Sequence, residues 1–256
     1  MMNISKSSNP VFKEQVFSKG YTSTSEVMTV SGTINKTALM LLLVVAGALF
    51  TWNKFFDAIA INPEAGIAAV GPWLAIGGIG GIIAALVTIF RPQNSGVSAP
   101  IYALFEGLLL GGLSAVFESM YPNIVMRAVA LTLAVFFSML FLYRSGIIKV
   151  TKKFMMGVFA ATAGIAIVYL VSFIGSFFGM NSSFLHGNSN LSIGISLVVI
   201  VVAALNLVLD FNFIEKASQS GAPKYMEWYG AFGLMVTLIW LYLEILRLLA
   251  KLASRK

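Results

Sequence analysis

Cysteine is absent from this 256-residue chain, and histidine occurs once. Without cysteine there is no disulfide framework, no thiolate metal site and no cysteine nucleophile. The single histidine, His186, lies in the polar segment FLHGNSN. A serine protease inside the membrane needs serine and histidine facing each other within the helix bundle, and a zinc site needs more ligands than one histidine supplies. We therefore predict that the protein is not an enzyme and carries no cofactor.

Charge is also scarce, because only 11% of the residues are charged while 58% are hydrophobic. Several apolar runs reach the length of a bilayer crossing, which is typical of a polytopic α-helical membrane protein. Seventeen Lys and Arg residues against ten Asp and Glu residues give a net charge of +7. The basic residues lie mostly at the ends of apolar segments. This arrangement indicates topology signals and argues against nucleic-acid binding. The connections are too short for a separate soluble domain.

Seven membrane spans can be placed from the apolar runs. Their predicted ranges are 38–55, 72–90, 100–120, 124–143, 154–178, 191–211 and 228–250. Residues 1–37 are polar, so we expect a partly disordered cytoplasmic tail and no signal peptide. Residues 38–250 then form the membrane domain, and residues 251–256 form a basic C-terminal tail.

The basic residues favour a cytoplasmic N-terminus. With that orientation eleven Lys and Arg residues fall in cytoplasmic segments, whereas the external loops contain only Lys54 and Arg127. The C-terminal tail breaks the rule if the last span crosses fully, since Lys251 and Arg255 would then lie outside. A re-entrant last segment is the alternative.

Four acidic residues lie within the predicted spans, where a charge is costly and therefore marks a candidate functional site: Glu106, Glu118, Asp210 and Glu244. Glu118 precedes Tyr121 and Pro122 at a helix end, where water can reach it. Glu106 has no basic residue nearby in sequence, so it needs a partner from another helix, a proton or water. Glu244 has two readings: a partner on another helix, or an intrahelical ion pair with Arg247 three residues on.

Glycines recur in the second and third spans, in GGIGG at 77–81 and at Gly107, Gly111 and Gly112. Small residues let helices approach closely in lipid. We predict a packing role for these glycines. A retinal protein is a poor alternative for the seven spans, because the last span has no interior lysine.

Three segments carry a resemblance to a known family. APIYALFEGLLLGGLSAVFESMYPNIVMRAVALTLAVFFSML resembles the Bax inhibitor-1 signature, in which a glycine-rich span is followed by a short turn and a span with spaced Ala, Thr and Val-Phe. LVLDFNFIE resembles the family's sixth span, which ends in an aspartate, and LYLEILRLL resembles its last span. Over residues 36–250 the chain is similar to the longer bacterial branch, labelled Bax inhibitor-1/YccA-like.

The resemblance implies a fold and a function. It implies six helices wrapped around a central C-terminal helix, and a calcium leak channel gated by protons in a bacterial cytoplasmic membrane. By resemblance, Asp210 and Glu244 form the pH-sensing carboxylate pair and contact calcium transiently, while Arg91 in VTIFRPQ is the basic residue that latches onto the aspartate in the closed state. Calcium is then the permeant ion.

Three features differ from the family pattern. The second acid is usually aspartate, and Glu244 is longer by one methylene. The connection EKASQSGAPKYMEWYG between the last two spans is longer than usual. An acid that many members carry in the second span is missing, and Glu106 on the third span is a candidate replacement as an additional pore acid.

The chemistry of two neighbouring carboxylates fits such a switch. Two carboxylates within hydrogen-bond range share one proton and titrate as a unit, and a nearby arginine favours their ionised form. Carboxylates in a wet passage also suit calcium, which prefers oxygen ligands. Two other functions stay open: a non-conducting modulator of another membrane complex, such as a quality-control protease, or a proton-coupled cation transporter.

Overall fold

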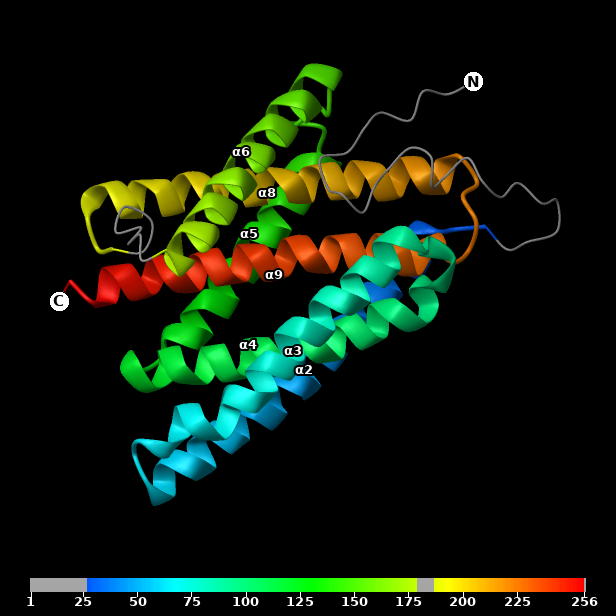
Figure 1. The fold of residues 1–256 in the computed structure, drawn as a ribbon. Helices are drawn as coiled ribbons and strands as arrows, with labels where there is room; N and C mark the ends of the chain where they lie inside the picture. The colour runs from blue at the N-terminus through cyan, green and yellow to red at the C-terminus, as the bar shows by residue number, and fades with distance from the viewer. Residues whose placement is uncertain (1–26, 179–186, 256) are drawn as a thin grey trace. The chain divides into compact units, whose positions relative to one another are not determined.

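A computed structural model describes residues 27–178 and 187–255 (Figure 1). The described chain contains seven helices that are long and apolar enough to cross a membrane. They are α2 (Val30–Ile61), α3 (Ala65–Phe90), α4 (Ser95–Met120), α5 (Ile124–Arg144), α6 (Lys152–Phe177), α8 (Asn190–Gln219) and α9 (Met226–Ala253), with a short 3₁₀ helix η1 (Pro92–Asn94) before α4. The predicted all-α class with seven spans is confirmed. His186 lies outside the described residues.

Most of the helices begin earlier than the sequence pattern predicted, although α5 begins at the predicted residue, Ile124. Two predicted spans started at Pro72 and Pro100, yet α3 and α4 continue on the N-terminal side of both prolines. A membrane helix tolerates an internal proline when neighbouring groups satisfy the freed carbonyl. Residues 30–37, assigned to the tail, form the first two turns of α2. The Thr29 side chain caps this helix by accepting the Gly32 N–H at 3.0 Å.

The C-terminal helix also runs further than predicted. Lys251 was assigned to the basic tail, but α9 continues to Ala253 and the Lys251 side chain is buried. α9 is a continuous 28-residue helix, and the side of the membrane on which it ends stays a prediction. It has the largest buried share of the seven spans, 61% of its most apolar window. The position of α9 at the centre of six helices stays a prediction.

The chain divides into two compact units. The first contains described residues 27–125 and 214–235, and the second contains 126–213 and 236–255. In the first unit α4 packs against both α2 and α3 (Figure 1).

Close helix approach in the first unit depends on glycine, as predicted. A Cβ at Gly77 would lie 2.7 Å from the Phe105 carbonyl oxygen, and one at Gly111 would overlap the Ala48 carbonyl oxygen. Either side chain would force the backbones of two helices apart. Gly78 in the same GGIGG run differs, because a Cβ there meets nothing within 4 Å.

In the second unit, α8 packs against α5 and α6. Met155 and Val158 of α6 form a buried cluster with Leu209 of α8. Phe136 of α5 packs edge to face against Phe211 of α8, with ring centroids 5.6 Å apart. Residues 236–253 of α9 belong to the same unit as α6 and α8.

Candidate functional site

Glu244 lies in the middle of α9, and its residue is only 1% exposed. Its Oε1 accepts two hydrogen bonds, one from the Tyr169 hydroxyl of α6 at 3.0 Å and one from Arg247 Nη1 at 2.9 Å. The intrahelical pair with Arg247, which was one of two readings of the sequence, is therefore present. We call Tyr169, Glu244 and Arg247 the Glu244 site. Its hydrogen bonds connect α6 with α9.

The two oxygens of Glu244 differ. Oε2 is buried and accepts no hydrogen bond from any described residue. A buried polar atom without a partner is costly, and native proteins keep few of them. This oxygen is the place in the Glu244 site where a proton or a cation would gain most by binding.

Asp210 is fully buried in α8, in the same unit. Its Oδ2 accepts a hydrogen bond from the Thr237 hydroxyl of α9 at 2.6 Å. Thr237 precedes Glu244 by seven residues on one helix face, so the two partners on α9 stand about 10 Å apart along the axis. Asp210 therefore contacts the same face of α9 that carries Glu244, about two turns away from it along the helix. Their sharing of one proton stays a prediction.

Two further buried polar side chains join helices of the second unit. Asn206, one turn before Asp210, donates to Thr162 Oγ1 of α6 at 2.8 Å. Lys251, one turn after Arg247, donates to Ser196 Oγ of α8 at 2.8 Å. Sequence reasoning missed both residues, because Asn206 is neutral and Lys251 stands near the chain end. Polar side chains that bond between apolar helices stabilise their packing.

Arg91 and Glu106 belong to the first unit, whereas the Glu244 site belongs to the second. Arg91 is exposed at the C-terminal end of α3, where its N–H bonds the Val87 carbonyl oxygen at 2.8 Å. Since Asp210 belongs to the second unit, the Arg91 latch stays a prediction. Glu106 has its partner on its own helix: it is hydrogen-bonded to Tyr102, one turn earlier, and lies against Gly81.

Glu118 has a structural role at a helix end. Its carboxylate accepts the N–H groups of Asn123 at 2.6 Å and Val125 at 3.0 Å. These bonds cover N–H groups at the start of α5 that have no partner within the helix. Asn123 has a φ of 66°, which turns the chain sharply between α4 and α5.

A third buried acid beside Asp210 and Glu244 is Glu227, which escaped the sequence reasoning because it was placed in the connection before the last span. It lies in the first turn of α9 and is fully buried. Its Oε1 accepts the Thr29 N–H at 2.9 Å and the Thr29 hydroxyl at 2.8 Å, while Oε2 pairs with Lys36. Lys224 lies 3.4 Å from Oε1. We call these four residues the Glu227 cluster.

The Glu227 cluster fastens the start of α2 to the connection between α8 and α9. Met28, just before Thr29, is buried and donates its N–H to the Ala222 carbonyl oxygen at 2.7 Å. The Lys36 ammonium also lies 5.5 Å from the Trp228 ring centroid. Only Lys224, three residues from Glu227, was visible in sequence as a neighbour. Lys36 is 191 positions away.

Within the described ranges, no group of three or more His, Asp or Glu side chains could hold a metal ion. Calcium contact by Asp210 and Glu244 stays a prediction.

The fold and these buried acids define a polytopic α-helical membrane protein with carboxylates inside its spans. The family model described as Bax inhibitor 1 like matches residues 9–254. The match covers nearly the whole chain, so the protein belongs to the Bax inhibitor 1 like family. Comparisons with curated proteins and with solved structures gave no match.

Proposed function

We propose that the protein is a pH-responsive calcium leak channel of a bacterial cytoplasmic membrane, with its N-terminus in the cytoplasm. The observation that carries the proposal is the Glu244 site: a buried carboxylate with one bonded oxygen and one oxygen without a donor, inside an apolar helix. Ionisable residues within spans mark ion and proton pathways more often than they mark packing. The choice of calcium as the permeant ion is based on the resemblance to the Bax inhibitor-1 family, and the match to the Bax inhibitor 1 like family model supports that resemblance.

The Glu244 site suits a proton switch because ionised Glu244 joins two helices. The charged and titratable groups that face it are Arg247, Tyr169 and, one turn further, Lys251. A proton on Oε2 removes the negative charge that Arg247 and the Tyr169 hydroxyl both recognise, and charge-assisted bonds are roughly twice as strong as neutral ones. Protonation therefore weakens the connection between α6 and α9. We expect the leak to rise as the pH falls.

Asp210 supplies the second carboxylate of the pathway. It is buried on α8 beside Thr237 of α9, at a different height from Glu244, so a cation moving along this face of α9 would meet the two carboxylates one after the other. Calcium prefers oxygen ligands and keeps several waters, and conduction requires binding weak enough for release. Two carboxylates at separate positions along a passage bind calcium more weakly than a complete coordination shell would, and so allow its release.

Calcium flux into liposomes that contain only the purified protein tests the proposal. Wild type, Asp210→Asn, Glu244→Gln and the double variant are compared between about pH 5 and 8, with Glu64→Gln as a control because Glu64 is exposed. Either single substitution should flatten the pH dependence, and the double variant should add little. Additive, independent shifts would contradict a coupled pair.

The same assay separates the other functions. Wild-type protein that carries no calcium would favour the modulator of another complex. Flux that needs an imposed proton gradient would favour the transporter. For the latch, Arg91→Ala should raise the basal leak, and an unchanged leak at equal folded yield would contradict it.

The orientation has its own test, which the lack of cysteine makes clean. Ser145 follows α5 and Asn62 follows α2, and both are exposed. With a cytoplasmic N-terminus, an impermeant thiol reagent should label Asn62→Cys on intact cells and Ser145→Cys only after permeabilisation. The reverse result would invert the proposed topology.

A further inference from the structure

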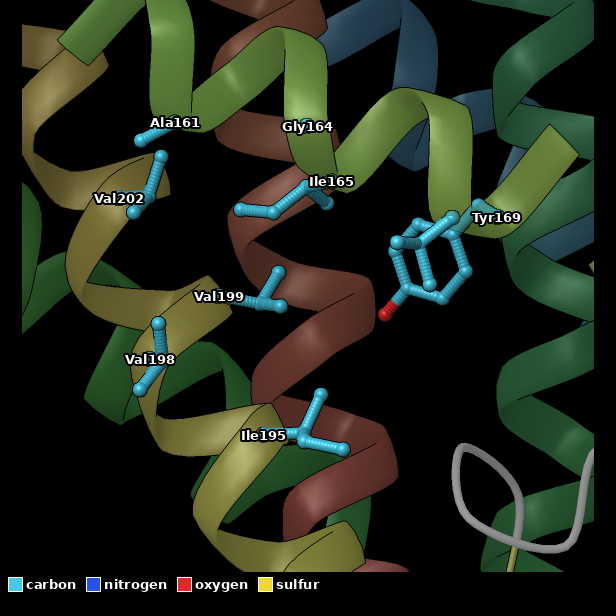
Figure 2. Close-up of a pocket in the computed structure, with 9 residues that line it drawn as sticks. Ala161, Gly164, Ile165, Tyr169, Ile195, Val198, Val199 and Val202 are labelled. Atoms are coloured by element: carbon cyan, nitrogen blue, oxygen red, sulfur yellow. The ribbon is translucent and has the colours of Figure 1, made fainter. Parts of the chain in front are cut away.

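An apolar cavity of about 510 Å³ lies between α6 and α8 in the second unit (Figure 2). Nine residues line it, five from α6 and four from α8, and eight of them have no polar side-chain atom. The exception is Tyr169 of the Glu244 site, which lies at one end. The volume is within the range of ligand pockets.

The cavity is a groove with a buried floor and exposed rims. Val199 and Val202 of α8 are buried beneath it, whereas Val168 and Val198 are exposed beside it. At Gly164 a Cβ would meet nothing within 4 Å, so the space beside this position is open. In a chain that spans the membrane, such rims face hydrocarbon, and a groove between them takes an apolar chain.

The end marked by Tyr169 carries positive charge. The Arg247 guanidinium lies 5.8 Å from the Tyr169 ring centroid, and its side chain is 42% exposed. Its Nη1 donates to Glu244 Oε1, and the exposed side of the guanidinium carries further N–H groups. Lys251 follows one turn later on the same face of α9, and Arg255 lies just beyond the end of the helix. Arg247 and Lys251 outweigh ionised Glu244 by one formal positive charge.

We propose that this groove binds one acyl chain of an anionic phospholipid, whose phosphate accepts hydrogen bonds from Arg247. The lining runs along α6 from Tyr169 to Ala161, roughly 12 Å of helix axis, so a chain fits lengthwise. Guanidinium binds phosphate through paired N–H groups, which the exposed side of Arg247 still offers. The groove supplies the apolar contact and the arginine supplies the selection for an anionic headgroup.

Native mass spectrometry of the full chain in detergent tests the groove, with phosphatidylglycerol and phosphatidylcholine of identical acyl chains as probes. Wild type should bind phosphatidylglycerol about tenfold more tightly, as expected for one charge-assisted contact. Gly164→Leu fills the groove and should weaken binding of both lipids about tenfold. Gly157→Leu is the matched control, because Gly157 lies on the same helix outside the groove and a Cβ there also meets nothing within 4 Å.

The headgroup contact is tested with the double variant Glu244→Gln, Arg247→Gln, which removes both charges and leaves no buried carboxylate without its cation. It should lose the preference for phosphatidylglycerol, while its affinity for phosphatidylcholine, whose phosphate is offset by the choline cation, should fall by less. Equal binding of the two lipids by wild type would overturn the proposal, as would full binding by Gly164→Leu. A dimer that Gly164→Leu alone dissociates would show that a second copy occupies the groove instead.

Discussion

Two glutamates of α9 are equally buried and differently partnered. Glu227 has both carboxylate oxygens engaged: Oε1 by Thr29 and Lys224, and Oε2 by Lys36. Glu244 has both of its bonds on Oε1, and Oε2 has none from any described residue. Glu227 also lies in the first turn of its helix, where the helix dipole favours a negative charge, whereas Glu244 lies in the middle.

The difference shows how a buried glutamate can stabilise the fold at one position and change its protonation state at another. A buried carboxylate with both oxygens bonded to donors favours its ionised form, because a proton on either oxygen competes with a donor that is already there. A carboxylate with an empty oxygen can accept a proton there while keeping its bonds on the other oxygen. We therefore infer that the Glu227 cluster holds the fold and that the Glu244 site changes state.

The largest expected effect is that of Glu227→Gln. This substitution leaves Lys36 and Lys224 without their carboxylate, and breaking a buried ion pair from one side costs about 3 kcal/mol. Chemical denaturation in detergent micelles should show this loss in the free energy of unfolding. Glu64→Gln, at an exposed position of the same unit, should change it by less than about 0.5 kcal/mol. Equal stability of the two variants would mean that the Glu227 cluster does not hold the fold.

Gly32→Ala should destabilise the same cluster without removing any charge. A Cβ at Gly32 would overlap the Glu227 carboxylate, and that carboxylate is held on two sides by Thr29 and Lys36, so it cannot move away freely. We expect a loss of about 2 kcal/mol, within the range for overpacking. Gly78→Ala should cost nothing or stabilise slightly, because its Cβ has open space and alanine favours a helix. If Gly32→Ala stabilised the protein as Gly78→Ala is expected to do, the Glu227 carboxylate would be free to move away from the added Cβ.

The Glu227 cluster also marks the limit of prediction from sequence. Hydropathy located all seven helices, and the spacing of three residues suggested the Glu244–Arg247 pair, because both signals are local. Lys36 and Glu227 are separated by 191 positions, and no local pattern joins them. The Asp210–Thr237 bond was missed for the same reason, since it depends on how α8 and α9 align. Helix starts were misplaced at Pro72 and Pro100 because the surroundings that satisfy an internal proline are tertiary.

Glu244→Gln should cost less stability than Glu227→Gln, about 1.5 kcal/mol. The amide oxygen of glutamine can still accept the Tyr169 hydroxyl, and no hydrogen bond to Oε2 is broken because none is present. The Arg247 side chain, which loses its ion pair, is 42% exposed and therefore costs less to leave unpaired than a buried cation. Chemical denaturation of both variants under the same conditions measures the difference in their free energies of unfolding. A loss as large as that of Glu227→Gln would place the Glu244 site among the structural contacts and remove the argument for a switch.

Tyr169→Phe should have the smallest effect, about 1 kcal/mol, because it removes a single hydrogen bond from an oxygen that Arg247 also serves. Tyr121→Phe is the matched control, since the Tyr121 hydroxyl bonds no residue within the described ranges. In a Glu244→Gln background the cost of Tyr169→Phe should fall to about 0.5 kcal/mol, since a hydroxyl bonds a neutral amide about half as strongly as a carboxylate. The double-mutant cycle thus measures how much of the connection between α6 and α9 depends on the charge of Glu244. If Tyr169→Phe costs the same in both backgrounds, the charge does not strengthen that connection, and protonation of Glu244 would leave α6 as firmly attached to α9 as before.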